Sequence, residues 1–270
     1  MKDTAPGPIC TACGTEYSAG PPLSQCHICE DERQYVPIGG QRWTMLAELA
    51  QNHQVEWSED APGIHQLVIR PHFAIGQRAL LIETGHGNVL WDCIALLDDQ
   101  TEARIRSMGR LSAIAISHPH YYTTNRIWAE AFDVPVFLHS DDAEWVQRAH
   151  PRLRHWQGDT HAIAPGLTLI RCGGHFDGAT VLHSTDGKGR LFTGDVLQVT
   201  PDRTHVSVMW SYPNYVPVGA AVIRRIEAIL EPYAYDAVHG AFPGMTIGTD
   251  GKAAVARSFA RYLVAIGAAG

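Results

Sequence analysis

The 270-residue chain lacks any long uninterrupted apolar run. A helix that crosses a bilayer needs about 20 mainly apolar residues, so we expect no transmembrane helix and no membrane partner. The N-terminal stretch MKDTAPGPIC also lacks the apolar core of a secretory signal. Together these absences predict a cytoplasmic protein.

Positive charge is scarce as well. The chain carries 21 Lys and Arg against 28 Asp and Glu, a net charge of −7. Electrostatic binding to nucleic acid requires a basic face on the protein, so we expect no nucleic-acid partner. Internal repeats and low-complexity tracts are also absent. The length suits one large α/β domain, either alone or with a small module.

Only six cysteines are present, and without a signal peptide they favour metal binding over disulfides. Four of them form two CxxC pairs, Cys10 with Cys13 and Cys26 with Cys29. Two such knuckles can close a tetrahedral site, so we predict structural zinc, with disulfides or free thiols as alternatives. The knuckles also resemble those of rubredoxin. That likeness would imply iron and a redox role, since four sulfurs alone do not separate the two metals.

Residues 1–36 are rich in Pro, Gly and Cys and lack apolar periodicity. A segment of about 30 residues cannot form a stable core without a cross-link such as a bound metal ion. This predicts a zinc-ribbon-like module over residues 1–36 and a main domain over residues 37–270. In the main domain, β-prone runs come in two batches, each followed by helices. This order predicts an α/β fold, a four-layer αβ/βα sandwich with two sheets inside. The expected helices span 40–53, 100–108, 124–132, 141–149, 217–233 and 252–266.

Four β-prone runs end in residues that could carry chemistry, and scaffolds usually present catalytic groups on loops at strand ends. The four stretches are SHPHYYTTN (117–125), CGGHFDGATVL (172–182), LFTGDVL (191–197) and AVHGAF (237–242). Between them they offer His118, His120, His175, Asp195 and His239. Imidazole and carboxylate ligands suit Zn and Fe(II), so the pattern predicts a metal site.

The same stretches, in the same order, resemble the metallo-β-lactamase-fold hydrolase superfamily over residues 40–270. VLWDC resembles its early strand that ends in an acidic residue, here Asp92, which we expect to orient a ligand or cap a turn. SHPHYYT stands where the superfamily has His-x-His-x-Asp-His, and GGHFDG, FTGD and the HG at 239–240 resemble its later elements. The N-terminal CxxCGTxY…CxxC…DERQYV unit further resembles a subgroup of bacterial and fungal members.

The resemblance implies an αββα fold in which His118, His120 and His175 bind one metal. It also implies that Asp195 bridges to or completes that site, and that His239 belongs to a second site. However, Tyr122 and Thr123 replace the Asp-His pair of the second site. A phenol is a poor ligand at neutral pH because its pKa is about 10, so we predict a mononuclear site holding Zn or Fe.

The predicted function is a mononuclear metal-dependent hydrolase of a small ester, thioester, lactone or phosphoester, using metal-bound hydroxide. Asp195 is assigned to the catalytic centre, and His239 or Tyr122 would transfer the proton. The alternative role for Tyr122 is packing. The alternative role for His239 is a hydrogen bond to the backbone at the end of its strand. Two other functions stay open. One is an iron oxidoreductase resembling the persulfide dioxygenases, and the other is a non-catalytic binding protein. The expected partner is a small-molecule substrate, and a homodimer is left open.

Overall fold

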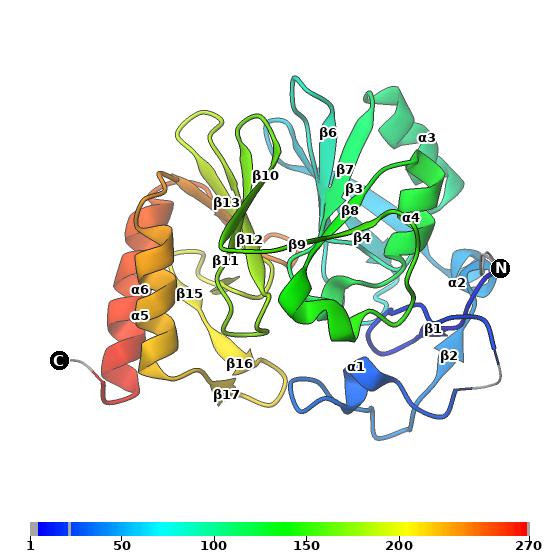
Figure 1. The fold of residues 1–270 in the computed structure, drawn as a ribbon, viewed down its shortest axis with the longest axis horizontal. Helices are drawn as coiled ribbons and strands as arrows, with labels where there is room; N and C mark the ends of the chain where they lie inside the picture. The colour runs from blue at the N-terminus through cyan, green and yellow to red at the C-terminus, as the bar shows by residue number, and fades with distance from the viewer. Residues whose placement is uncertain (1–4, 21–22, 269–270) are drawn as a thin grey trace.

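The computed structural model describes residues 5–20 and 23–268. Two sheets face each other, and helices cover their outer faces (Figure 1). Buried apolar side chains fill the space between the sheets and the two spaces between each sheet and its helices. The four-layer αβ/βα sandwich predicted from the sequence is thereby confirmed.

The first sheet has the strand order β3-β4-β5-β6-β7-β8-β9. Its strands are β3 (Gln54–Ala61), β4 (Ile64–Arg70), β5 (Ala79–Ile82), β6 (Asn88–Trp91), β7 (Leu111–Ala115), β8 (Val136–His139) and β9 (Leu153–Trp156). The pairs from β3 to β6 are antiparallel, and those from β6 to β9 are parallel. Parallel neighbours need a crossover, which α3 (Asp99–Ser107) and α4 (Asn125–Phe132) provide. The carboxyl ends of β6, β7 and β8 therefore share one edge.

The second sheet has the order β10-β11-β12-β13-β18-β19. Its strands are β10 (Thr160–Ala164), β11 (Leu167–Arg171), β12 (Thr180–Ser184), β13 (Arg190–Phe192), β18 (Ala237–His239) and β19 (Thr246–Ile247). Helices α5 (Ala220–Leu230) and α6 (Gly251–Ala265) cover its outer face (Figure 1). Strands β13 and β18 run parallel, so the segments that follow them start at the same edge.

Three local predictions differ from the structure. The helix expected over 40–53 covers only α2 (Leu46–Asn52), because β2 (Trp43–Thr44) pairs with β1 (Ile9–Cys10). The helix expected over 141–149 is a 3₁₀ segment, η2 (Ser140–Trp145). Its backbone is non-helical at Asp142, whose carboxylate accepts the Gly178 N–H at 2.8 Å. Strand β3 was not predicted, because its polar edge position hides the β pattern.

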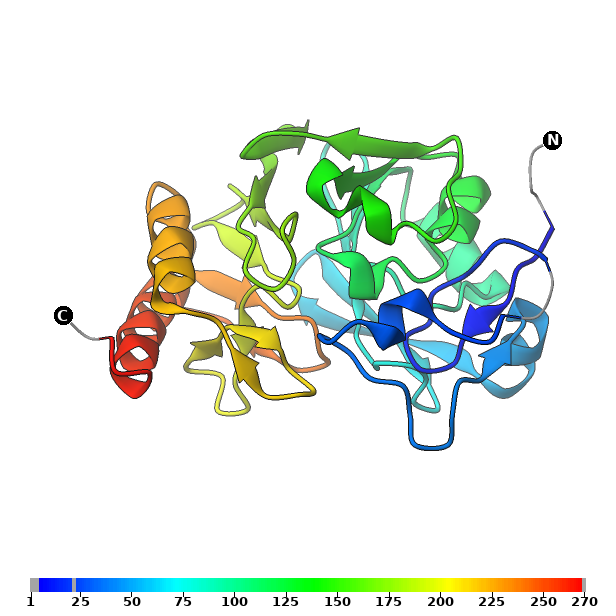
Figure 2. The same cartoon turned by 60° about the horizontal axis from the view of Figure 1, so that its bottom comes forward.

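The N-terminal module comprises β1, the short helix α1 (His27–Glu30) and the loops around them, and it contacts both halves of the sandwich (Figures 1 and 2). Within the module, Cys10 pairs with Trp43, which lies beyond the boundary predicted at residue 36. On the first half, the Glu16 N–H donates to the Thr123 carbonyl at 3.1 Å. On the second half, the Asn214 side chain donates to the carbonyls of Glu32 and Gln34, both at 2.9 Å. Asn214 lies in the loop between β16 (Met209–Ser211) and β17 (Val216–Pro217).

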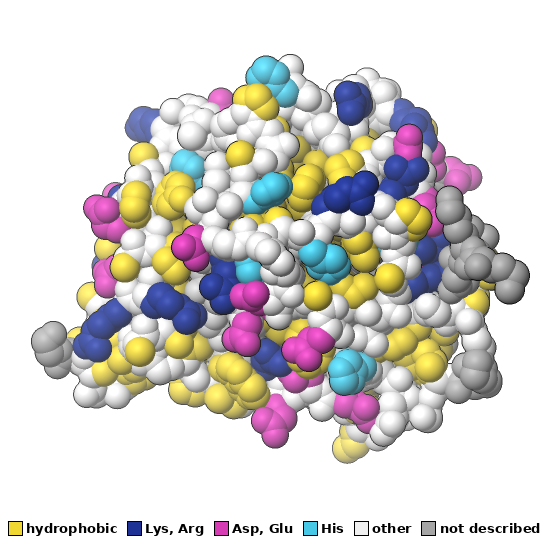
Figure 3. All heavy atoms as spheres, in the orientation of Figure 1, with side chains coloured by type: hydrophobic (Ala, Val, Ile, Leu, Met, Phe, Trp, Pro, Cys, Tyr) yellow, Lys and Arg dark blue, Asp and Glu magenta, His cyan; other side chains and the backbone are white. Residues whose placement is uncertain are grey.

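The surface carries both signs of charge. On the face drawn in Figure 3, basic and acidic side chains are interspersed, and no continuous basic patch forms on that face. Within the described part of the chain, no helix has the length and apolarity to cross a membrane.

Candidate metal centre

The four predicted pocket ligands converge at the shared edge of the two sheets. His118 and His120 follow β7 at the 3₁₀ turn η1 (Pro119–Tyr121), His175 lies between β11 and β12, and Asp195 follows β13. Each offers one ligand atom, these atoms all lie within 4.8 Å of one another, and all four residues are buried. For example, His175 Nε2 lies 3.1 Å from His120 Nδ1. The structure thus brings together residues separated by up to about 80 positions in the sequence.

The donor set fits a metal ion. Three buried atoms of the cluster have no hydrogen-bond partner among the described residues: His118 Nε2, His120 Nε2 and Asp195 Oδ1. Buried polar atoms nearly always have a hydrogen-bond partner, so three unpartnered atoms at one point indicate a missing partner that all three can share. Three imidazoles and one carboxylate are ligands that Zn or Fe(II) accepts.

Hydrogen bonds fix the orientation of two of the imidazoles. His118 Nδ1 lies 2.8 Å from the Ser117 hydroxyl, and His175 Nδ1 lies 3.2 Å from the Met209 carbonyl. The Ser117 backbone N–H in turn donates to the Asp92 carboxylate at 2.7 Å. Such outer contacts set which ring nitrogen faces the metal. The expected role of Asp92, capping the turn behind a ligand, matches this position.

Gly194, in the stretch FTGD, is required for the contact between Ser117 and His118. Its φ is +50°, and a Cβ at this position would lie 2.3 Å from the Ser117 hydroxyl oxygen. Any other residue would therefore push Ser117 away from His118. The glycine before Asp195 is explained by this close approach.

Burial sets the electrostatics of the cluster. It lowers the pKa values of His118 and His120 well below the usual range and that of His175 to about 4, with smaller effects from neighbouring imidazoles and Arg33. The imidazoles are therefore neutral at pH 7, which is the form that binds metal. Burial also raises the pKa of Asp195 to about 7. A carboxylate in this position is stabilised by a cation beside it.

Of the two tyrosines, Tyr121 lies beside the ligands. Its ring centroid is 4.3 Å from that of His118, and its buried hydroxyl, which has no hydrogen-bond partner among the described residues, lies near enough to counteract the burial effect on the pKa of Asp195. The Tyr121 backbone N–H donates to the His118 carbonyl at 3.1 Å, which holds the two residues together at the turn. Tyr122 points elsewhere: it is buried in the core, and its hydroxyl lies 3.5 Å from the Asp142 carbonyl. The structure therefore gives Tyr122 the packing role and Tyr121 the position beside the site.

His239 is held apart from the four ligands. Its Nδ1 lies 2.7 Å from the Asp60 carboxylate, and its ring stacks on Phe192 with centroids 4.7 Å apart. Asp60 also accepts a hydrogen bond from Arg78 at 2.6 Å, and that guanidinium is buried. His239 does not belong to the group of atoms within 4.8 Å. Sequence reasoning missed Asp60 and Arg78, because a polar edge strand and a lone arginine carry no motif.

The N-terminal module occupies the place next to Tyr122 and Thr123, the two positions that lack second-site ligands. The Glu16 N–H donates to the Thr123 carbonyl at 3.1 Å, and Thr123 adopts a positive φ of 36°. The buried Glu16 carboxylate binds the Arg126 guanidinium, with one N–O distance of 2.8 Å, and also contacts Arg148. A surface that contacts the N-terminal module therefore lies where the superfamily resemblance implies the Asp-His pair.

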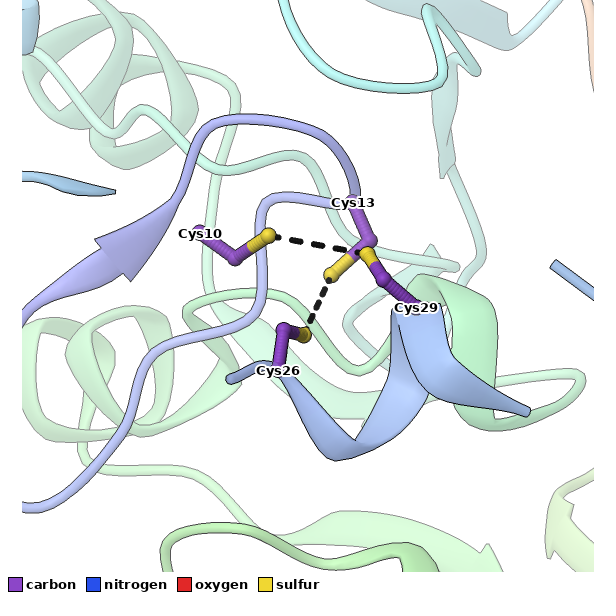
Figure 4. A group of neighbouring side chains, drawn as sticks. All are labelled: Cys10, Cys13, Cys26 and Cys29. Atoms are coloured by element: carbon purple, nitrogen blue, oxygen red, sulfur yellow. Dashed lines mark hydrogen bonds between the residues drawn. The ribbon is translucent and has the colours of Figure 1, made fainter. Parts of the chain in front are cut away.

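The four knuckle cysteines form a second buried cluster (Figure 4). The Sγ atoms of Cys10 and Cys29 are 3.7 Å apart and those of Cys13 and Cys26 are 3.6 Å apart, with no disulfide among them. A tetrahedral zinc site with Zn–S bonds near 2.3 Å has sulfur–sulfur edges of about 3.8 Å. Tyr17 also donates a hydrogen bond to a cluster sulfur. The spacing and chemistry fit the predicted structural metal.

A cavity of about 310 Å³ opens over the histidine cluster. Its lining residues are Ala12, Gln34, Tyr35, His72, Ala74, Ile75, His120, His175, Asp195, Gln198, Tyr212, Pro213 and Phe242. The module supplies part of the wall, and His72 is a lining imidazole that sequence reasoning did not assign. Another cavity, of about 330 Å³, lies among turns such as Glu83–His86 and contains none of the candidate ligands. The cavity of about 310 Å³ is therefore the one that three candidate ligands, His120, His175 and Asp195, line.

Solved structures share this architecture. The VMB-1 crystal structure superposes with a TM-score of 0.59 at 15% identity, covering 79% of this chain and 98% of that one. The DIM-1 metallo-β-lactamase gives 0.59 at 15% identity, covering 78% and 98%. A B3 metallo-β-lactamase with an active-site glutamic acid gives 0.53 at 18% identity, covering 83% and 95%. Together with the two residue clusters, these likenesses define a protein of the metallo-β-lactamase fold.

No protein-family model matches the sequence. The chain belongs to the family of "Uncharacterized protein YmaE" of Bacillus subtilis (strain 168), with which it shares 42% identity over 265 residues, 96% of each chain.

Proposed function

We propose that the protein is a mononuclear metal-dependent hydrolase. One observation carries the proposal: three neutral imidazoles and one carboxylate converge, with three unpartnered buried atoms, and His120, His175 and Asp195 of this group line a substrate-sized cavity. When bound, the ion would supply an activated water and a Lewis acid for the scissile bond. His118, His120, His175 and Asp195 would hold it.

Other residues orient the four candidate ligands or act beside them. Ser117 and the Met209 carbonyl keep two imidazoles in the ligating orientation. Tyr121 places its hydroxyl beside Asp195 and stabilises the charged carboxylate. His72 is the lining imidazole outside the ligand set, so it is assigned to move the proton between water and leaving group. His239, bound to Asp60, acts as a structural residue at the neighbouring strand end.

The test combines metal analysis with an activity panel. Protein purified with its native metal is assayed against uncharged aryl esters, thioesters and lactones and against phosphoesters, alongside His118→Ala. We expect the variant to lose one metal per chain and all activity. His155→Ala is the matched control, because His155 is an exposed imidazole on the edge strand β9 and does not belong to the cluster; it should keep both metals and full activity.

Three outcomes would contradict the proposal. Full pocket-metal occupancy in His118→Ala would show that the ligand assignment is wrong. A metal-loaded wild type that hydrolyses no member of the panel would favour a binding protein. Pocket iron together with thiol-dependent oxygen consumption would favour the oxidoreductase alternative.

A further inference from the structure

Charge is almost missing from the walls of the metal-site cavity. Among the described residues that line it, Asp195 is the one carboxylate, and no lining residue is Lys or Arg. The other titratable lining groups are imidazoles and tyrosines. A substrate carboxylate or phosphate held in such a cavity would meet no charge-assisted hydrogen bond from a guanidinium or ammonium group.

The arginine that precedes the lining residue Gln34 in the sequence cannot serve as an anion anchor. Arg33 precedes Gln34, yet its guanidinium is bound by Asp31 through two contacts of 2.6 and 3.0 Å. It also lies 3.9 Å from the centroid of the Phe176 ring. Its side chain is only 15% exposed. The donors of Arg33 are therefore committed to the protein, and the neighbouring Glu32 adds negative charge at the surface.

The walls instead offer apolar surface and neutral polar groups. Tyr35, Ile75, Pro213 and Phe242 supply rings and aliphatic carbon. The Tyr212 hydroxyl lies within 3.0 Å of the Asp195 and Ser207 carbonyls, so this residue presents its ring to the cavity. Amides come from Gln34 and Gln198. A volume of about 310 Å³ is at the small end of ligand pockets.

Given the proposed hydrolase function, on which this step rests, we infer that the substrate is uncharged. It is a small ester, thioester or lactone whose apolar or aromatic group packs against Tyr35, Tyr212 and Phe242. Acyl compounds that carry a carboxylate away from the scissile bond are excluded, because that charge would lie against walls that hold no Lys or Arg.

A matched pair of esters tests the inference on the metal-loaded protein. 4-Nitrophenyl butyrate and 4-nitrophenyl hemisuccinate share a leaving group and differ by a terminal carboxylate. We expect kcat/KM to be at least about tenfold higher for the butyrate, a difference of about 1.4 kcal/mol. Gln198→Lys places a cation on the cavity wall and should narrow the ratio severalfold. Gln51→Lys adds the same charge at an exposed position of α2 and should leave the ratio of the two kcat/KM values unchanged.

Equal or faster turnover of the hemisuccinate by wild type would overturn the inference while leaving the hydrolase proposal standing. If neither ester is turned over, calorimetric binding of butyranilide and succinanilic acid decides the matter. Tighter binding of butyranilide would support an uncharged ligand and sink only the hydrolase proposal. Tighter or equal binding of succinanilic acid would overturn the inference as well.

Discussion

The backbone N–H of Glu16 donates to the carbonyl oxygen of Thr123 at 3.1 Å. This bond joins the N-terminal module to the turn that carries His118 and His120. Thr123 stands at one of the two positions where the superfamily resemblance places ligands of a second metal. The module thus packs behind the candidate metal site and also supplies Gln34 and Tyr35 to the cavity wall.

Glu16→Gln tests how firmly the module is docked. The Glu16 carboxylate is buried with Arg126 and Arg148, and removing one partner of a buried ion network typically costs about 3–5 kcal/mol. We expect a loss of that order in the free energy of unfolding, measured by urea denaturation. Glu130→Gln is the control, because Glu130 binds the same Arg126 from an exposed position, where a pair contributes at most about 1 kcal/mol. Equal losses in both variants would contradict the docking role.

The double variant Cys10→Ser/Cys13→Ser tests the four-sulfur site. It leaves two sulfurs, which cannot hold zinc tightly, so we expect one metal fewer per chain and a lower Tm. Cys93→Ala is the control, since Cys93 is buried in the main core away from the knuckles. Elemental analysis of both proteins gives the answer. An unchanged metal count in the double variant would exclude a knuckle metal.

The sequence was sufficient to predict the sandwich from the order of its strands and helices, and to predict which residues gather in the candidate site from motifs at strand ends. His175 and Asp195 could be placed beside His118 without coordinates for this reason. The Asp60–His239 pair could not be predicted, since it depends on how an edge strand approaches the second sheet. Which of Tyr121 and Tyr122 lies beside the cluster depends on a 3₁₀ segment only one turn long, which leaves no periodic signal.

Asp60 should make stability depend on pH in the acid range. Burial alone would raise its pKa, but the hydrogen bond with His239 and the charge of Arg78 hold the pKa well below the usual value of about 3.9. A depressed carboxyl pKa contributes stability that is present above the unfolded-state value and is lost as the pH falls through the folded-state value. We expect wild-type stability to fall as the pH drops below about 4.

Asp60→Asn removes that contribution and leaves the buried Arg78 unpaired. At pH 7 we expect a loss of about 3–5 kcal/mol in the free energy of unfolding, and a smaller loss of stability on acidification than in wild type. Glu59→Gln is the control on the same strand, because Glu59 is exposed; it should change stability by less than about 0.5 kcal/mol. A steeper acid dependence in Asp60→Asn than in wild type would refute this account.

Tyr121 and Tyr122 provide a matched test of the centre itself. Tyr121→Phe removes the hydroxyl beside Asp195 while keeping the ring against His118. Loss of a group that supports a ligand typically weakens metal binding about 10- to 100-fold, so we expect a shift of that size in chelator competition. Tyr122→Phe removes a hydroxyl that faces the Asp142 carbonyl, and it should leave pocket-metal affinity within about twofold of wild type. The reverse order of effects would restore Tyr122 as the residue that acts on the metal site.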